Sequence, residues 1–500
     1  MEEETVVTYG DIEITPYGLV NIQSIKIIKR VNEHVRFTFT AIIPDEKKDS
    51  YVNATGSENQ VSMIIKDGSG KKRVLFEGIV LNVAVRVKAG VYFLSVEAIS
   101  NTYALDIKRK ERSFQNPQLS YTALIDDITS SYEKAHFKDD VTNGKKLAKL
   151  VMQYEETDWQ FLKRMASHFY TVLIPDASVG NPRFYFGLPE DQDKGEINVT
   201  QYTLRKRISD FRNDAENHLP GAVDYDYNVY EIECSQLLDL GNTVKFKSKQ
   251  LVVGEVVIEM KEGTLNYQYK LFPRNGLRQN KKHNNAIIGA SIQGRVLRVK
   301  KDMVQAKLDM DDQEDQNMDY WFPYSTIYAS DNNTGWYFMP EENDSIRIYF
   351  PSNKEEEGIA ISSVVKPSPT SSAPKSRSSS SNSGGTTASI AAVHSSGGTP
   401  APDRMDDPAI KTLRTKYGKE IMLAPDKIII SAGDMQIILS DKDGIQIISG
   451  QNVEITAAQN LLLSSQNIGI SASKLKLSGN GNEITLEDKI TVQGSEIKMN

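Results

Sequence analysis

The residues that could carry acid–base chemistry gather in one stretch, where Glu155, Glu156 and Asp158 precede His168. Carboxylates and imidazoles are the side chains that most often transfer protons in enzymes. The same residues also flank a helical pattern, with the acids at its start and the histidine near its end. Acidic groups stabilise the positive N-terminus of a helix, and cationic groups stabilise its negative C-terminus. We therefore interpret this set as helix-terminal charges.

Two further stretches match ligand-binding loops only in part. Residues 68–72 (GSGKK) have the glycines and lysines of a phosphate loop. They lack the GxxxxGK[ST] spacing and lie between two strand-like runs, which favours a hairpin turn. Residues 309–315 are acidic but lack the glycine at position 6 and the glutamate at position 12 of an EF-hand calcium loop. Neither stretch predicts a ligand site.

Histidine and cysteine usage excludes most catalytic and metal-binding patterns. The histidines show neither HExxH nor another ligand spacing, and the chain has no GxSxG nucleophile motif. The single cysteine, Cys234, excludes a disulfide framework, and its alternating neighbours favour packing as a small hydrophobe. We therefore predict that the protein is not an enzyme and binds no cofactor and no metal. A cell-wall hydrolase is the alternative, and a peptidoglycan-clearing assay would detect its activity. The six histidines are His34, His136, His168, His218, His283 and His394.

Composition indicates a soluble chain of three or four domains. The chain has 500 residues, 39% of them hydrophobic and 25% charged. Its net charge of −7 argues against a general nucleic-acid binder. The N-terminus has no basic and apolar leader pattern, and no run of about 18 apolar residues occurs. We expect the protein to be assembled in the cytoplasm without a signal peptide and delivered outward by another route.

The pattern of apolar residues divides the chain into six segments and predicts a mainly β protein. Alternating runs with turns between them indicate strands, and several such strands favour β-barrels. The predicted segments are a first β-barrel at 1–110, a helical segment at 111–170, a second β-barrel at 171–285, an OB-fold barrel at 286–365, a Ser/Gly/Pro-rich linker at 366–402 and a β-helix needle at 403–500.

Local patterns predict individual strands and hairpins within these segments. Two hairpins are expected, one joining 251–260 to 264–271 and one joining 292–299 to 303–308. The second lies in the OB-type segment, which carries seven basic and fourteen acidic residues from 285 to 365. A groove that binds a single nucleic-acid strand needs a net positive charge, whereas this segment is net negative. The segment therefore does not predict nucleic-acid binding. Further strands are expected at 35–43, 61–65, 74–80 and 91–98.

Residues 111–170 are expected to contain two helices. Apolar residues at helical spacing mark 121–132 and 159–169. Thr157 or Asp158 can cap the second helix. Three polar residues of the second helix are expected to face away from its apolar stripe: Lys163, Arg164 and Ser167.

The last hundred residues repeat pairs of aliphatic residues two positions apart, separated by Gly, Asn, Asp, Ser, Gln and Ala. Period-2 spacing places each pair on one face of a short strand. One chain cannot enclose so narrow an apolar row, whereas three chains form a three-faced prism around it, a rod of roughly 45 Å. A single-chain β-helix is the alternative, but its coils need longer repeats. The predicted core residues are Ile428, Ile430, Ile437, Leu439, Ile445, Ile447, Val453, Ile455, Leu461, Leu463, Ile468, Ile470, Leu475, Leu477, Ile484, Leu486, Ile490 and Val492.

In this order, the segments resemble VgrG-type spike proteins, which join the tail hub (late control protein D-like) and the puncturing spike of contractile injection systems in one polypeptide. The resemblance covers nearly the whole chain except the linker. The matching stretches are LD at 105–106, RSFQ at 112–115, TDWxFLxRMA at 157–166, GRV at 294–296, WFPY at 321–324, GWYFMP at 335–340, DSIRI at 344–348, DP at 407–408 and RTxxGKEI at 414–421.

The resemblance implies a fold and a set of partners. The fold would comprise two hub-type β-barrels, an OB-fold barrel and an intertwined trimeric β-helix or prism. The homotrimer would meet the inner tube hexamer and baseplate proteins, carry a PAAR-type tip protein and effector cargo, and pierce a target envelope. Tip contacts are expected at Ile497, Met499 and Asn500, and no metal in the tip. A phage tail spike or fibre that binds receptors is the alternative function.

Overall fold

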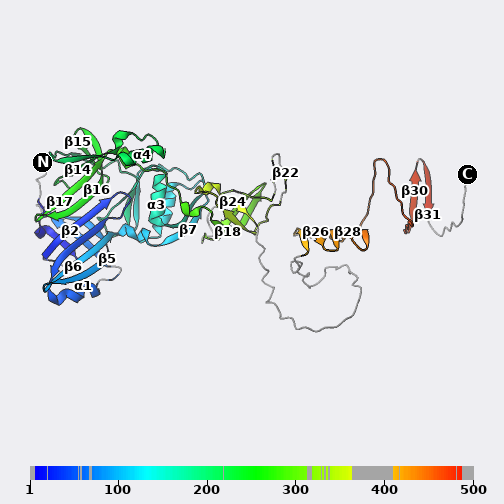
Figure 1. Cartoon of the computed structure of the whole chain (residues 1–500), viewed down its shortest axis with the longest axis horizontal. Helices are drawn as coiled ribbons and strands as arrows, with labels where there is room; N and C mark the ends of the chain where they lie inside the picture. The colour runs from blue at the N-terminus through cyan, green and yellow to red at the C-terminus, as the bar shows by residue number, and fades with distance from the viewer. Residues whose placement is uncertain are drawn as a thin grey trace. The chain divides into compact units, whose positions relative to one another are not determined.

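The computed structural model comprises two compact units, residues 1–373 and 374–500, and each is described by itself (Figure 1). The predicted linker at 366–402 lies outside the described residues. None of the helices that the structure describes is long and apolar enough to cross a membrane. The described residues are 6–17, 19, 21–54, 56, 59–66, 70–217, 219–311, 318–327, 329–330, 334–335, 338–362, 409–415, 417–479 and 481–486.

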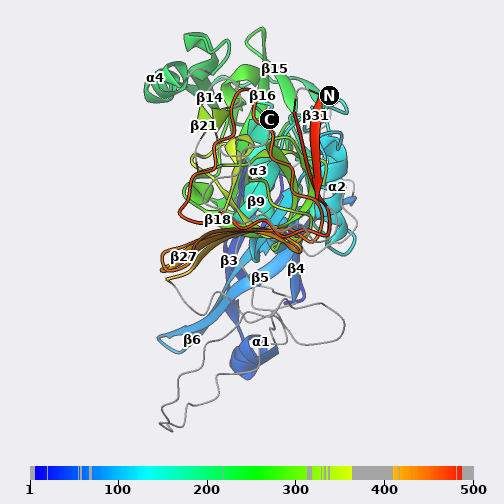
Figure 2. The ribbon, with the colours of Figure 1, turned by 90° about the vertical axis from the view of Figure 1, so that its right-hand side faces the viewer.

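The first unit is built on a 12-stranded sheet. Its strands alternate buried and exposed residues, as the period-2 runs predict, and the 61–65 and 74–80 runs pair as β4 and β5. The long hairpin of β5 and β6 can be followed in Figure 2. The strands, in sheet order, are β1 (Ile12–Thr15), β4 (Gln60–Lys66), β5 (Lys72–Lys88), β6 (Val91–Ser100), β3 (Arg36–Ile43), β2 (Asn21–Arg30), β16 (Lys249–Lys261), β17 (Thr264–Phe272), β14 (Asn228–Glu233) and β13 (Tyr202–Lys206); in addition, β15 (Thr243–Phe246) pairs with β16, and β12 (Asp193–Glu196) pairs with β15.

The two predicted barrels share this sheet. Strand β2 lies beside β16 (Figure 1) and pairs antiparallel with it. This register places Ile27 opposite Ile258. Both isoleucines are fully buried in one core cluster that draws residues from both segments. The predicted hairpin of 251–260 and 264–271 is present as β16 and β17. A continuous sheet leaves neither segment with an unpaired edge at this junction.

The helical segment packs a separate core between the sheets. Apolar residues of α2 (Tyr121–Ser130) and α3 (Asp158–Ser167) are buried there, as their spacing predicts. Thr157 caps α3 with a reciprocal capping box to Gln160. Short strands surround these helices: β7 (Arg109–Phe114) pairs with β9 (Val151–Thr157), and β8 (His136–Asp139) and β10 (Leu173–Pro175) flank β11 (Arg183–Phe186). We call residues 6–277 the N-terminal body; it also contains α1 (Lys48–Ala54) and α4 (Ile208–Glu216).

One expectation about α3 is wrong. Arg164 and Ser167 do not face away from the core, because both are buried, with exposed fractions of 3% and 0%. Helical periodicity ranks side chains by polarity, and it cannot detect a polar partner supplied by a distant part of the chain.

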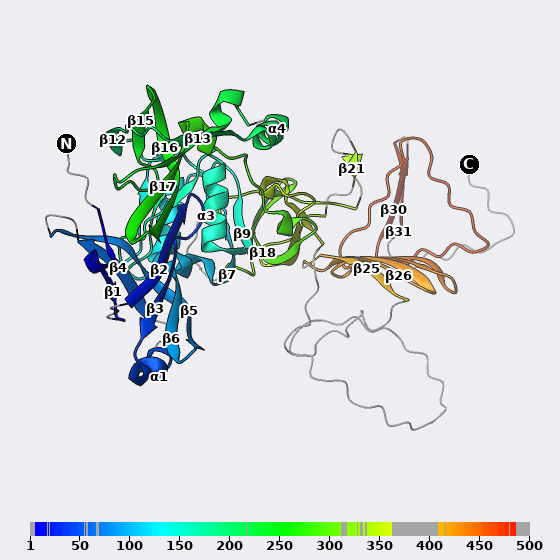
Figure 3. The ribbon, with the colours of Figure 1, turned by 60° about the vertical axis from the view of Figure 1, so that its left-hand side comes forward.

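A five-stranded sheet follows the N-terminal body. The predicted hairpin of 292–299 and 303–308 is present, with Lys300 opposite Met303. Helix α3 lies between this sheet and the 12-stranded sheet (Figures 1 and 3). The OB-type closure of this segment stays a prediction. The strands are β20 (Phe322–Pro323), β19 (Met303–Leu308), β18 (Ser291–Lys300), β23 (Ser345–Tyr349) and β24 (Ile359–Ile361), and β21 (Ala329–Ser330) pairs separately with β22 (Thr334–Gly335).

The second unit contains an antiparallel meander and a hairpin (Figure 3). Gly433 and Gly444 have positive φ in turns of the meander, a conformation that glycine adopts without strain. Between Ile448 and Leu475 no strand is assigned to the chain, although all of these residues are described. The meander consists of β25 (Lys411–Arg414), β26 (Lys419–Ala424), β27 (Lys427–Ala432), β28 (Met435–Ser440) and β29 (Gly444–Ile448), and the hairpin of β30 (Leu475–Gly479) and β31 (Asn482–Leu486).

Candidate functional site: an aliphatic face on the C-terminal strands

The meander aligns the predicted core residues in two rows. Residues two apart on one strand share a face, and each is paired with its counterpart on the next strand. The first row runs across Leu423, Ile428, Leu439 and Ile445. The second row runs across Ile421, Ile430, Ile437 and Ile447. The register of the hairpins therefore aligns the repeated aliphatic pairs, and the two rows together form one continuous aliphatic face.

This aliphatic face is uncovered in the single chain. Its six predicted core residues, from Ile428 to Ile447, are between 39% and 73% exposed. The opposite face of the same strands is more enclosed, since Met422 is buried and Ile429 and Ile438 are half-buried. Contiguous exposed apolar surface is typical of interaction sites, which makes this face the candidate functional site.

The same pattern continues where the chain forms no strands of its own. Between β29 and β30 the predicted core pairs remain 56% to 64% exposed. An extended segment without ladder partners leaves its backbone N–H and C=O groups available for pairing with another chain. These residues are Val453, Ile455, Leu461, Leu463, Ile468 and Ile470.

The structure describes only some of the remaining predicted core and tip residues. Leu475 and Leu477 lie on β30, opposite Leu486 and Ile484 on β31. Nothing is described of the Ile484 and Leu486 side chains. The predictions for Ile490, Val492, Ile497, Met499 and Asn500 fall outside the described residues. The core and tip assignments stay predictions.

Asp158, proposed above as a helix-terminal charge, is the centre of a buried hydrogen-bond network. Its carboxylate is fully buried and accepts from Lys110 Nζ at 2.6 Å, Arg112 Nη2 at 2.9 Å, Gln153 Nε2 at 2.9 Å and Tyr132 Oη at 2.6 Å. Four donors to one carboxylate satisfy its acceptor sites and fix the position of helix α3 against β7 and β9.

The acid–base set does not converge on one point. Glu156 accepts from Arg164, and His168 is within 3.3 Å of the Tyr121 hydroxyl. Burial, together with Arg164 and Lys281, lowers the pKa of His168 to about 2. His168 is therefore neutral in the fold at physiological pH.

The buried His168 should make stability pH-dependent. In the unfolded chain this imidazole titrates near 6.5, whereas in the fold it stays neutral down to about 2. As pH falls below 6.5 the unfolded chain binds a proton that the fold excludes, so stability decreases by about 1.4 kcal/mol per pH unit. Between pH 7 and pH 5, the free energy of unfolding of His168→Gln should fall by about 2 kcal/mol less than that of the wild type. Denaturant unfolding at the two pH values measures this difference. Identical pH dependence of the two proteins would contradict this assignment.

The acidic stretch at 309–315 has a structural role at its described end. The buried Asp311 accepts from the backbone N–H and the hydroxyl of Ser113, both at 2.6 Å. Burial raises the pKa of Asp311. Residues 312–315 lie outside the described chain.

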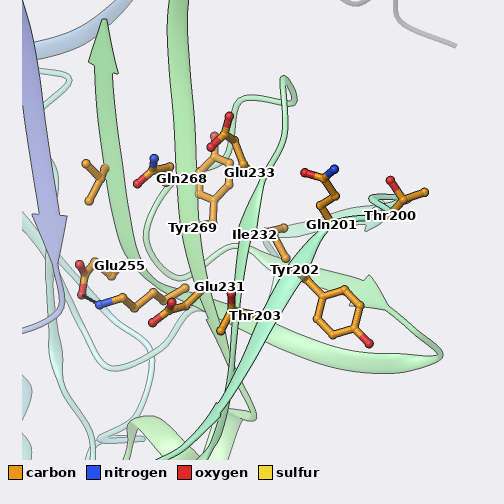
Figure 4. Close-up of a pocket in the computed structure, with 12 residues that line it drawn as sticks. Thr200, Gln201, Tyr202, Thr203, Glu231, Ile232, Glu233, Glu255, Gln268 and Tyr269 are labelled. Carbon is orange, nitrogen blue, oxygen red and sulfur yellow. Dashed lines mark hydrogen bonds and ion pairs between the residues drawn. The ribbon is translucent and has the colours of Figure 1, made fainter. Parts of the chain in front are cut away.

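A polar hollow of about 760 Å³ lies on the face of β13, β14, β16 and β17 (Figure 4). Its carboxylates are used in cross-strand pairs. Glu231 accepts from Arg205 at 3.1 Å, and Glu255 pairs with Lys270 at 3.1 Å and Arg30 at 3.2 Å. The hollow resembles a solvated charge ladder across a sheet more closely than an acid–base site.

Similarity to known proteins is found with one family model and with solved structures. The family described as the Alg8 N-terminal domain matches residues 19–180. A search of curated proteins finds no match. The E. coli c3393 protein, described as a type VI secretion component similar to the phage T4 tail proteins gp27 and gp5, is 12% identical; the alignment covers 71% of this chain and 99% of that one, with a TM-score of 0.50.

A second solved structure is similar over more of the chain. It is the half-lidded Francisella PdpA–VgrG complex, which aligns at 12% identity over 89% of this chain and 88% of its own, with a TM-score of 0.50. At this identity a likeness establishes the fold. By this likeness, the chain has a VgrG-type spike fold.

Proposed function

We propose that the chain is the non-enzymatic hub–spike of a contractile injection apparatus and acts as a homotrimer. The observation that carries this proposal is the aliphatic face of β25–β29, continued by the exposed pairs from Val453 to Ile470. Three copies bury this surface in a prism whose layers are hydrogen-bonded between chains. Such a closed stack has no free strand edges and is stiff.

The rest of the chain connects this needle to the apparatus. The N-terminal bodies of three copies form a ring that meets the inner tube hexamer and the baseplate, and the five-stranded sheet closes as an OB-type barrel. The needle carries a PAAR-type tip protein and effector cargo and pierces the target envelope when the apparatus contracts. The chain is assembled in the cytoplasm and leaves with the apparatus. The fold shared with a type VI secretion component supports this reading.

Removal of the needle tests the proposal. The full chain should elute with a light-scattering mass of roughly three times 55.9 kDa, because the aliphatic face is buried only between copies. Residues 1–402 should show a weakened trimer and no binding of the PAAR-type tip protein. A monomeric full chain at micromolar concentration would overturn the proposal.

A further inference from the structure

Arg164 lies at the boundary between the N-terminal body and the five-stranded sheet. From helix α3, its Nε and Nη2 donate to the Glu156 carboxylate at 2.7 to 3.1 Å, and Nη2 donates to the Met152 carbonyl at 2.5 Å. Its Nη1 donates to Glu355 Oε1 at 2.7 Å. The side chains of Arg164 and Glu355 are 3% and 1% exposed. One guanidinium thus holds a carboxylate from each side of the boundary in its planar fork.

Glu355 belongs to the far side of this boundary. It opens the short 3-10 helix η7 (Glu355–Glu357), which directly precedes β24 of the five-stranded sheet. The next residue, Glu356, accepts from Lys149 at 3.0 Å, and its carbonyl accepts from the Tyr320 hydroxyl. The Tyr320 contact holds this segment on the side of the five-stranded sheet, whereas Lys149 belongs to the N-terminal body and makes a second ion pair across the boundary.

Apolar packing crosses the same boundary. Leu150 and Met152, from the N-terminal body, are fully buried in the core cluster of the five-stranded sheet, where Ile292, Val304 and Ile348 also lie. Side chains in such a core interdigitate at crystal-like density. Arg164 is bonded to the carbonyl of Met152, so the ion pair and the shared core are continuous.

The chain also crosses the boundary in a segment that is tied down. The connector of residues 278–290 contains Lys282, whose backbone N–H donates to the Ser167 hydroxyl at 2.8 Å. Asn284 Nδ2 donates to the Tyr154 carbonyl at 2.7 Å. Ser167 in turn donates to the carbonyl of Arg164. The connector is thus fastened to the same turn of α3 that carries Arg164.

We propose that Arg164 is the positioning residue that locks the five-stranded sheet onto the N-terminal body, so that the two move as one body. The inference rests on the proposed function for its purpose, because a spike transmits axial force only if the part that bears the needle does not hinge on the hub. Removal of either acidic partner leaves a buried charge incompletely paired, which strongly destabilises the boundary.

Trypsin cleavage of the folded full chain at Lys281 and Lys282 tests the lock. Cleavage in a native connector requires local opening, and its rate follows the population of the open form. Arg164→Met should raise the cleavage rate roughly 100-fold, and the milder Glu355→Gln roughly 10-fold. Arg164→Lys should also be cleaved quickly, because a single ammonium cannot bridge two carboxylates in the same planar geometry.

Two controls distinguish a specific effect of Arg164 at this boundary from a general loss of stability. Arg205→Met removes an exposed cross-strand pair with Glu231 and should be cleaved at the wild-type rate. Far-UV circular dichroism of each variant confirms that the fold is retained. Cleavage of Glu355→Gln at the control rate would overturn the proposal. The light-scattering mass of the same samples reports the trimer independently, so a failed lock and a failed trimer are distinguishable.

Discussion

Replacing Ile437 by aspartate should convert the trimer to single chains. Ile437 lies in the middle of the second aliphatic row, between Ile430 and Ile447. In the proposed prism three copies of this side chain meet near the axis, so the variant would place three carboxylates in one apolar layer. Each aliphatic side chain lost from such a layer removes about 1.5–3 kcal/mol of burial, and burying unpaired charges costs considerably more.

The same strand supplies the matched control. Gln436 is adjacent to Ile437 and therefore points to the opposite face of β28. Gln436→Glu should leave the trimer intact, although it adds a charge to the same strand. Light scattering and native mass spectrometry of both variants measure the result. Dissociation by both substitutions would indicate general damage to the strand, and dissociation by neither would contradict a buried aliphatic axis.

Truncation of Asp158 to alanine should lower the free energy of unfolding of the N-terminal body by about 3–5 kcal/mol. The side chain is fully buried, and its loss leaves the cations Lys110 and Arg112 without their shared carboxylate. Gln153 and Tyr132 also lose an acceptor. Denaturant unfolding followed by intrinsic fluorescence measures the change, since Trp159 is buried next to the site.

An exposed carboxylate provides the comparison for Asp158. Asp191 pairs with Lys138 in a solvent-exposed bridge, with exposed side-chain fractions of 65% and 44%. Surface pairs of this kind contribute little to stability, so Asp191→Ala should unfold at nearly the same denaturant concentration as the wild type. A loss below about 1 kcal/mol for Asp158→Ala would show that water replaces the missing acceptor.

Short-range patterns in this chain were sufficient for most individual elements. The hairpin of β16 and β17, the capped start of α3 and the aliphatic pairs of the C-terminal strands all depend on residues a few positions apart. Hydrophobic periodicity and turn-forming residues are properties of such short windows. They can therefore be recognised in the sequence without knowledge of the tertiary structure. The resemblance then predicted the VgrG-type fold that the structural comparisons support.

Long-range pairings were not predictable in the same way. The sequence suggested two barrels, yet β2 and β16 join them in one sheet. Asp311 belongs to an acidic stretch of the sequence, yet it accepts hydrogen bonds from Ser113, 198 residues away. No local signal distinguishes a polar residue that has a distant buried partner from one that is solvated.

The candidate sites show the same division. The aliphatic row of the C-terminal strands follows from the sequence alone, because strand periodicity assigns each side chain to a face. The burial of Arg164 is visible in the folded chain and not in the sequence, because its partner Glu355 lies 191 residues further along the chain. Burial of a charge depends on which groups folding brings together, and that is settled by the packing of whole elements.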